Sequence, residues 1–91
     1  MKEYEMVVEM MISGEVCDKW VGSELFEADT IEEALLDAVR SEYEEVQRTT
    51  SGRYFTNMTF VEEGFGVVGW VDESGTEIKD IITMREWKGV E

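Results

Sequence analysis

The sequence contains no histidine, no proline and a single cysteine, Cys17. Histidine is the side chain that most often acts as a general acid or base near neutral pH, so its absence removes the commonest catalytic group. Without histidine, and with one thiol, a single chain cannot form an ordinary zinc site or an intramolecular disulfide. We therefore expect no metal site, no cofactor and no disulfide framework.

Long apolar runs are also missing. None approaches the roughly 18 residues of a membrane span, and the segment Met1–Glu5 lacks the basic and apolar stretches of a signal peptide. These absences predict a cytoplasmic protein without a membrane segment. The 91 residues are nevertheless 43% hydrophobic, which is too apolar for a disordered acidic tail. A chain of this length supports one core, so we expect a single domain over residues 1–91.

Basic residues are scarce. Eight Lys and Arg stand against 22 Asp and Glu, and the net charge of −14 exceeds the magnitude of about 2 to 8 that suffices to keep a small domain soluble. The first 46 residues carry a net charge of −11, so the excess lies mainly in the first half of the chain. Binding to nucleic acid or to an anionic membrane requires Lys and Arg, and is excluded on this ground. The charge instead selects a basic partner.

The first 28 residues have the pattern of a β-hairpin. Apolar side chains alternate with other residues from Tyr4 to Ile12, which is the period of a half-buried strand. Ser13-Gly14-Glu15 can form a turn into a second strand over residues 16–28. Gly22-Ser23 interrupts that strand, and a bulge is expected there.

A helix is predicted after the hairpin. Thr30-Ile31-Glu32-Glu33 reads as a capping box, in which the Thr30 hydroxyl and the Glu33 carboxylate satisfy backbone donors of the first turn. Apolar residues then recur at three- and four-residue spacing and form one stripe. The stripe consists of Ile31, Ala34, Leu35, Ala38, Val39, Tyr43 and Val46. The helix should end near Arg48.

The remaining sequence predicts three strands, over residues 54–62, 65–71 and 76–84, with turns at Glu63-Gly64 and Asp72–Gly75. The last segment also fits a helical period, but its Ile and Thr content favours a strand. The chain is thus expected to be an α+β domain of ββαβββ order, with a mainly antiparallel sheet and one amphipathic helix packed on one face.

One helix covers only one face of such a sheet, yet several strands have apolar residues on both faces. Val7 and Met11, for example, alternate with Val8 and Met10. The second face must be covered either by curling of the sheet, which its glycines permit, or by another chain, for example in a homodimer. The sequence leaves both alternatives open.

No group of residues predicts catalysis. The adjacent carboxylates Glu44-Glu45 and Glu62-Glu63 diverge, because neighbours on a helix or a strand point in different directions. Residues 72–77 lack the ligand spacing of a calcium loop. Cys17 has no nearby base to activate it, and we expect a buried structural thiol. The protein is therefore interpreted as a binding protein and not an enzyme.

Acidic residues are the candidate binding residues. On the predicted helix they are Glu32, Glu33, Asp37, Glu44 and Glu45, and on the first strand they are Glu3, Glu5 and Glu9. Such rows could imitate the charge of nucleic acid and occupy a basic nucleic-acid-binding surface of a partner protein. In size, acidity and lack of motifs, the chain resembles small phage-encoded inhibitors of host defence, including DNA mimics and anti-CRISPR proteins. The alternative is a homo-oligomeric accessory or structural domain whose acidity serves solvation.

Overall fold

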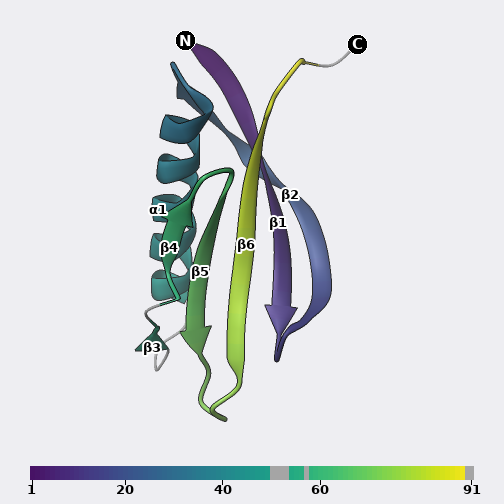
Figure 1. Ribbon diagram of the computed structural model, residues 1–91, viewed down its shortest axis with the longest axis vertical. Helices are drawn as coiled ribbons and strands as arrows, with labels where there is room; N and C mark the ends of the chain where they lie inside the picture. Colours follow the sequence, from purple (N-terminus) through teal and green to yellow (C-terminus); the bar gives the residue numbers. More distant parts are fainter. Residues whose placement is uncertain (50–53, 57, 90–91) are drawn as a thin grey trace.

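A computed structural model describes residues 1–49, 54–56 and 58–89, and shows one antiparallel sheet with a single helix beside it (Figure 1). The elements are β1 (Lys2–Ile12), β2 (Glu15–Ala28), α1 (Ile31–Thr49), β3 (Tyr54–Phe55), β4 (Phe60–Glu62), β5 (Phe65–Val71) and β6 (Glu77–Glu86). The strand order is β2-β1-β6-β5-β3, and β4 also pairs with β5. The predicted α+β class and ββαβββ order are confirmed, with β3 and β4 together in the place of the strand predicted over residues 54–62, and the last segment is a strand.

The β1–β2 hairpin has the predicted turn and the predicted bulge. Ser13 and Gly14 have φ angles of 51° and 85°, and two successive positive values are typical of the type I′ turn that joins twisted antiparallel strands. Pairing shifts between Glu5 and Val7, where Met6 alone faces three residues of β2, 22–24. A Cβ atom added to Gly22 would lie 2.9 Å from Met6 Cε, so this bulge packs directly on Met6.

The helix begins as expected. Thr30 Oγ1 accepts a hydrogen bond from the Glu33 main-chain N–H at 3.2 Å, which is the N-cap half of the capping box. The reciprocal bond from Thr30 to the Glu33 carboxylate is not formed in the described part of the chain. The helix ends at Thr49, one residue beyond the expected end. No helix among the described residues is long and apolar enough to span a membrane.

The core lies between α1 and one face of the sheet. Its sheet side includes Val8, Val68 and Ile82, all fully buried. Its helix side consists of Ala34, Leu35, Ala38, Val39 and Val46. Gly66 lets the two layers approach, because an added Cβ would lie 2.2 Å from Val39 Cγ2. Ile31 belongs to the predicted apolar stripe, but its side chain is exposed in the first turn.

The strand expected over residues 54–62 is interrupted. β3 and β4 lie along the same edge of β5, and the segment between them leaves the ladder. At Gly69, the Thr59 hydroxyl accepts from the main-chain N–H at 3.1 Å and donates to the carbonyl at 3.2 Å, and the same carbonyl also accepts from the Thr56 N–H at 3.1 Å. The expectation of one continuous strand was wrong because a side chain satisfies Gly69. Asn57 lies outside the described residues.

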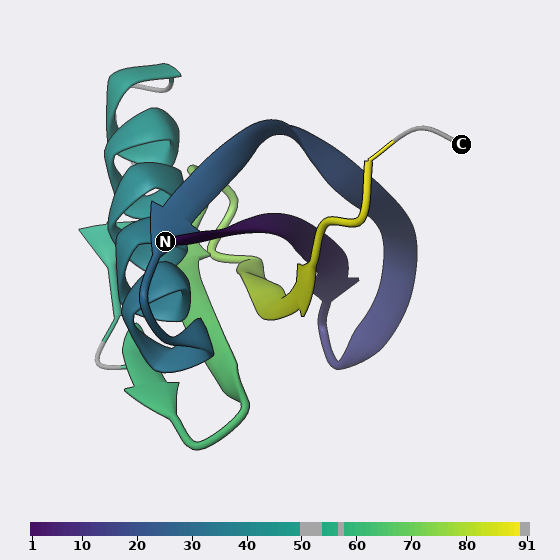
Figure 2. The same cartoon turned by 90° about the horizontal axis from the view of Figure 1, so that it is seen from above.

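The face of the sheet that points away from α1 is partly covered by curling. Viewed from above, β1 and β2 curve round β6 (Figure 2). Val67 faces away from the helix, because its neighbours in the chain, Gly66 and Val68, face toward it. Val67 is nevertheless only 2% exposed. On the same face, Phe60 and Val21 remain exposed. We call this surface the helix-free face.

Cys17 corrects one expectation, because it is exposed and not buried. It lies in β2, at the end of the sheet, where pairing with β1 shifts between Met10 and Met11. The hairpin tip that precedes Cys17, at Ser13 and Gly14, lies away from α1 (Figure 1). The lone thiol without a nearby base was expected to be buried, but residues 15–21 of this edge strand are exposed, and only the later part of β2, with Phe26 and Ala28, is buried in the core.

Candidate protein-binding surface

Three of the predicted helix acids lie together on the outer side of α1. Glu33, Asp37 and Glu44 are exposed, and their spacing of four and seven residues places them on one side of the helix. None of them forms an ion pair within the described part of the chain. Arg40 has the spacing to lie among them, so one base interrupts the row. We call these three carboxylates the outer helix acids.

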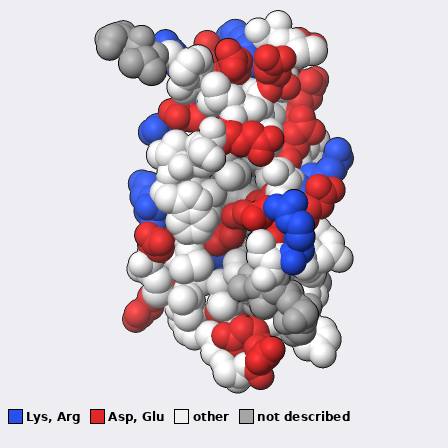
Figure 3. Space-filling model, turned by 180° about the vertical axis from the view of Figure 1, so that it is seen from behind, with Lys and Arg blue, Asp and Glu red and all other residues white. Residues whose placement is uncertain are grey.

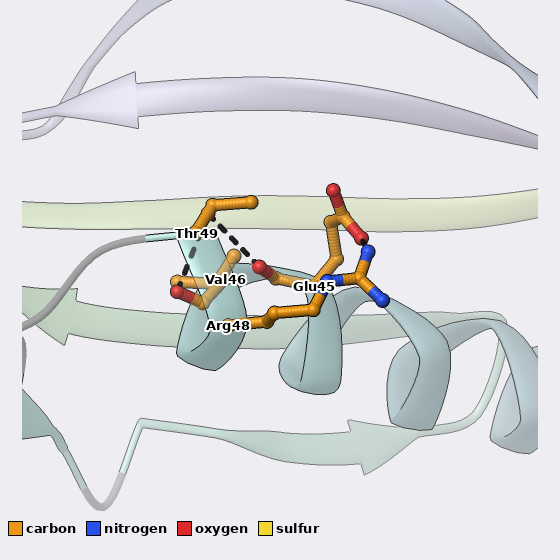
Figure 4. Close-up of polar contacts among 4 residues, drawn as sticks. All are labelled: Glu45, Val46, Arg48 and Thr49. Carbon is orange, nitrogen blue, oxygen red and sulfur yellow. Dashed lines mark hydrogen bonds and ion pairs between the residues drawn. The ribbon is translucent and has the colours of Figure 1, made fainter.

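The other two predicted helix acids lie on the flanks of α1. Glu32 borders a small pocket of about 230 Å³ between the start of the helix and the β4–β5 turn. Near the other end of the helix, the guanidinium of Arg48 forms an ion pair with Glu45 (Figure 4). The Thr49 hydroxyl donates to the Glu45 carbonyl at 2.9 Å in the same turn. The five predicted residues therefore do not form one continuous row.

The predicted strand acids lie on the helix-free face. They are Glu3, Glu5 and Glu9, and they alternate along β1 with residues that are buried against α1. Arg85 Nε donates to Glu5 at 2.6 Å, and Lys19 Nζ lies 3.5 Å from a Glu9 oxygen. Each base stands directly opposite its acid in the neighbouring strand. Glu5 and Glu9 are thus neutralised within the protein, whereas Glu3 has no ion pair among the described residues, and all three point away from the outer helix acids.

A groove of about 450 Å³ lies between the β2 bulge and α1. Met6 and Trp20 supply apolar lining, and Glu24, Glu42 and Glu45 supply three carboxylates. Sequence reasoning did not identify this site, because its residues come from three elements that are distant in the chain. The only available signal was the expected bulge at Gly22-Ser23, which leaves room beside Trp20.

The charge on the surface is uneven. Seen from behind, red acidic atoms are frequent at the top and along the upper part of the side occupied by α1, with some blue basic atoms among them, while uncharged side chains fill much of the middle (Figure 3). Basic atoms occupy fewer places on this face. Among the described residues, no three potential ligands are grouped in a way that could hold a metal ion. The arrangement offers carboxylates and apolar area to a cationic surface.

Comparison with protein-family models, curated proteins and solved structures finds no match to this chain. The surface itself is therefore the guide to function. Its main chemical property is negative charge without ion pairs in the described part of the chain, which includes the outer helix acids.

Proposed function

We propose that this chain is a protein-binding module that uses the acidic side of α1 to occupy a basic, nucleic-acid-binding surface of a partner protein. The observation that carries the proposal is the exposure of Glu33, Asp37 and Glu44 on one side of the helix, without an ion pair in the described part of the chain. Folding of the protein leaves these three charges available for a partner.

Lys and Arg side chains that hold phosphates would instead hold these carboxylates. The net charge of −14 would speed association with a basic surface and disfavour like-charged competitors. The same charge argues against direct binding of nucleic acid. Inhibition by charge imitation is the mode of the phage-encoded DNA mimics and anti-CRISPR proteins that the chain resembles in composition, and we assign the same mode to it.

A homo-oligomeric accessory domain is the second candidate function. Val21 and Phe60 support it, because both are large, exposed and on the helix-free face. An apolar contact between the helix-free faces of two chains would bury the side chains that curling of the sheet leaves exposed. Light scattering after size exclusion tests this directly: a dimeric mass supports the alternative, and a monomeric mass at high concentration contradicts it.

Affinity capture from a bacterial lysate tests the main proposal. The immobilised protein is exposed to lysate at low salt, and bound proteins are identified by mass spectrometry after elution with DNA. We expect a basic nucleic-acid-binding protein that DNA or salt releases, since both compete for the same cations. Recovery of the chain alone, or of partners that DNA and salt do not release, would contradict the proposal.

A further inference from the structure

The groove between β2 and α1 combines two kinds of lining. Trp20, at 36% exposure, and Met6 provide an apolar surface, and carboxylates from both sides of the groove surround it. Glu24 comes from the β2 bulge, whereas Glu42 and Glu45 come from α1. Its volume of about 450 Å³ falls within the range of roughly 300 to 1,000 Å³ that is usual for ligand pockets.

This lining fits a long cationic side chain. The methylene groups of such a side chain can pack on apolar surface while the charged end reaches carboxylates. Trp is the aromatic residue that attracts a cation most strongly over its ring. A planar guanidinium both stacks on an aromatic ring and donates to carboxylates through several N–H groups, so arginine matches the groove better than lysine.

The molecule itself provides a precedent for this contact. Glu45, one of the groove carboxylates, already binds the guanidinium of Arg48 from the next turn of α1 (Figure 4). Arg48 is not part of the groove lining. It holds one carboxylate at the margin and leaves Glu24 and Glu42 without an ion pair in the described part of the chain.

We propose that this groove binds an arginine side chain of the basic partner protein. The inference rests on the proposed function for the kind of partner, and adds a specific contact to it. The outer helix acids supply general attraction, while the groove selects an exposed arginine beside Trp20. Arg48 then acts as an internal competitor for Glu45.

A peptide titration followed by NMR tests the groove without any partner. The probe is acetyl-Gly-Arg-Gly-amide, and its neutral counterpart carries citrulline in place of arginine. We expect saturable shifts of the Trp20 indole N–H and of the amides of residues 22–24 and 41–45 with the arginine peptide. Equal shifts with the citrulline peptide, or shifts spread over all acidic surfaces, would overturn the proposal.

Matched variants separate the groove from net charge. Glu42→Gln and Glu24→Gln should each raise the dissociation constant about two- to fivefold, the effect of one partly exposed ion pair. Arg48→Gln should lower the constant by a similar factor, because it frees Glu45. Glu73→Gln removes an equal charge from the exposed β5–β6 turn and should have no such effect. If Glu73→Gln weakens binding as much as Glu42→Gln, the groove has no specific role.

The two proposals fail in different ways. If the arginine peptide binds saturably but the lysate capture fails, the proposal of a basic nucleic-acid-binding partner is contradicted and the groove proposal is supported. If a partner is captured and DNA releases it, but the arginine peptide does not bind, the groove proposal is contradicted and the proposed function is supported.

Discussion

The two faces of the sheet are held in different ways. The face under α1 is a continuous core in which Val8, Val68 and Ile82 are fully buried. The helix-free face has half-buried apolar residues such as Ile81, and two of its acids are paired across strands, Glu5 with Arg85 and Glu9 with Lys19. Burial of apolar side chains stabilises the face under α1, whereas partial curling of the sheet and ion pairs stabilise the helix-free face.

A second contrast concerns the acids themselves. On β1, Glu5 and Glu9 each face a base in the neighbouring strand, whereas Asp37 and Glu44 on α1 have no ion pair among the described residues. Glu5 and Glu9 therefore contribute ion pairs to the sheet, while the outer helix acids contribute none in the part of the chain that the structure describes. This difference is the reason for proposing the helix as the binding surface.

The largest effect on stability is expected from two adjacent isoleucines on opposite faces. Ile82→Ala should lower the free energy of unfolding by about 3 to 4 kcal/mol, because it opens a cavity under α1. Ile81→Ala, on the half-buried helix-free face, should cost about 1 kcal/mol. Urea unfolding measures both values. Equal losses would show that the helix-free face is as well packed as the core, as a dimer interface would be.

A smaller effect is expected from Gly66→Ala. The added Cβ would meet Val39 Cγ2 at 2.2 Å, so the helix or the strand must shift. Overpacking of this kind costs about 1 to 3 kcal/mol. The loss should shrink in a Val39→Ala background, which removes the clashing atoms, and a double-mutant cycle by urea unfolding measures this. Strictly additive losses would contradict close contact between α1 and β5.

The smallest effect concerns charge. Glu5→Gln with Glu9→Gln breaks two ion pairs and should lower the free energy of unfolding by about 1 kcal/mol at low salt. Asp37→Asn with Glu44→Gln removes the same charge from α1 and should change it by less than about 0.5 kcal/mol. Urea unfolding at low and high salt measures both losses. The difference in the free energy of unfolding between the two double variants should become smaller as salt is added. A greater loss of the free energy of unfolding from Asp37→Asn with Glu44→Gln would contradict the proposed difference between the strand acids and the helix acids.

Much of the fold follows from local patterns. Alternation predicted β1, the Thr30 cap predicted the start of α1, and glycine-rich segments predicted the turns. The break between β3 and β4 could not be predicted in this way, because it depends on a Thr59 hydroxyl that accepts from the Gly69 N–H in place of a main-chain carbonyl. The exposure of Cys17 depends on which strand lies at the edge of the sheet, which no local pattern determines.

The candidate site was predictable only in part. Four-residue spacing correctly places Glu33 and Asp37 on the same side of α1. The neutralisation of Glu5 by Arg85 joins residues 80 positions apart and depends on the register of β1 with β6. The groove likewise requires the bulged part of β2, with Trp20, to lie beside the second half of α1. Long-range pairing therefore decides which acids remain available.

The most direct test compares two triple variants in the lysate capture. Glu33→Gln, Asp37→Asn and Glu44→Gln change the outer side of α1, while Glu3→Gln, Glu5→Gln and Glu9→Gln change the helix-free face by the same net charge. Circular dichroism confirms that both remain folded. We predict that the helix variant loses the DNA-releasable partner and that the strand variant retains it. Equal loss from both variants, or retention by the helix variant, would contradict a binding surface on α1.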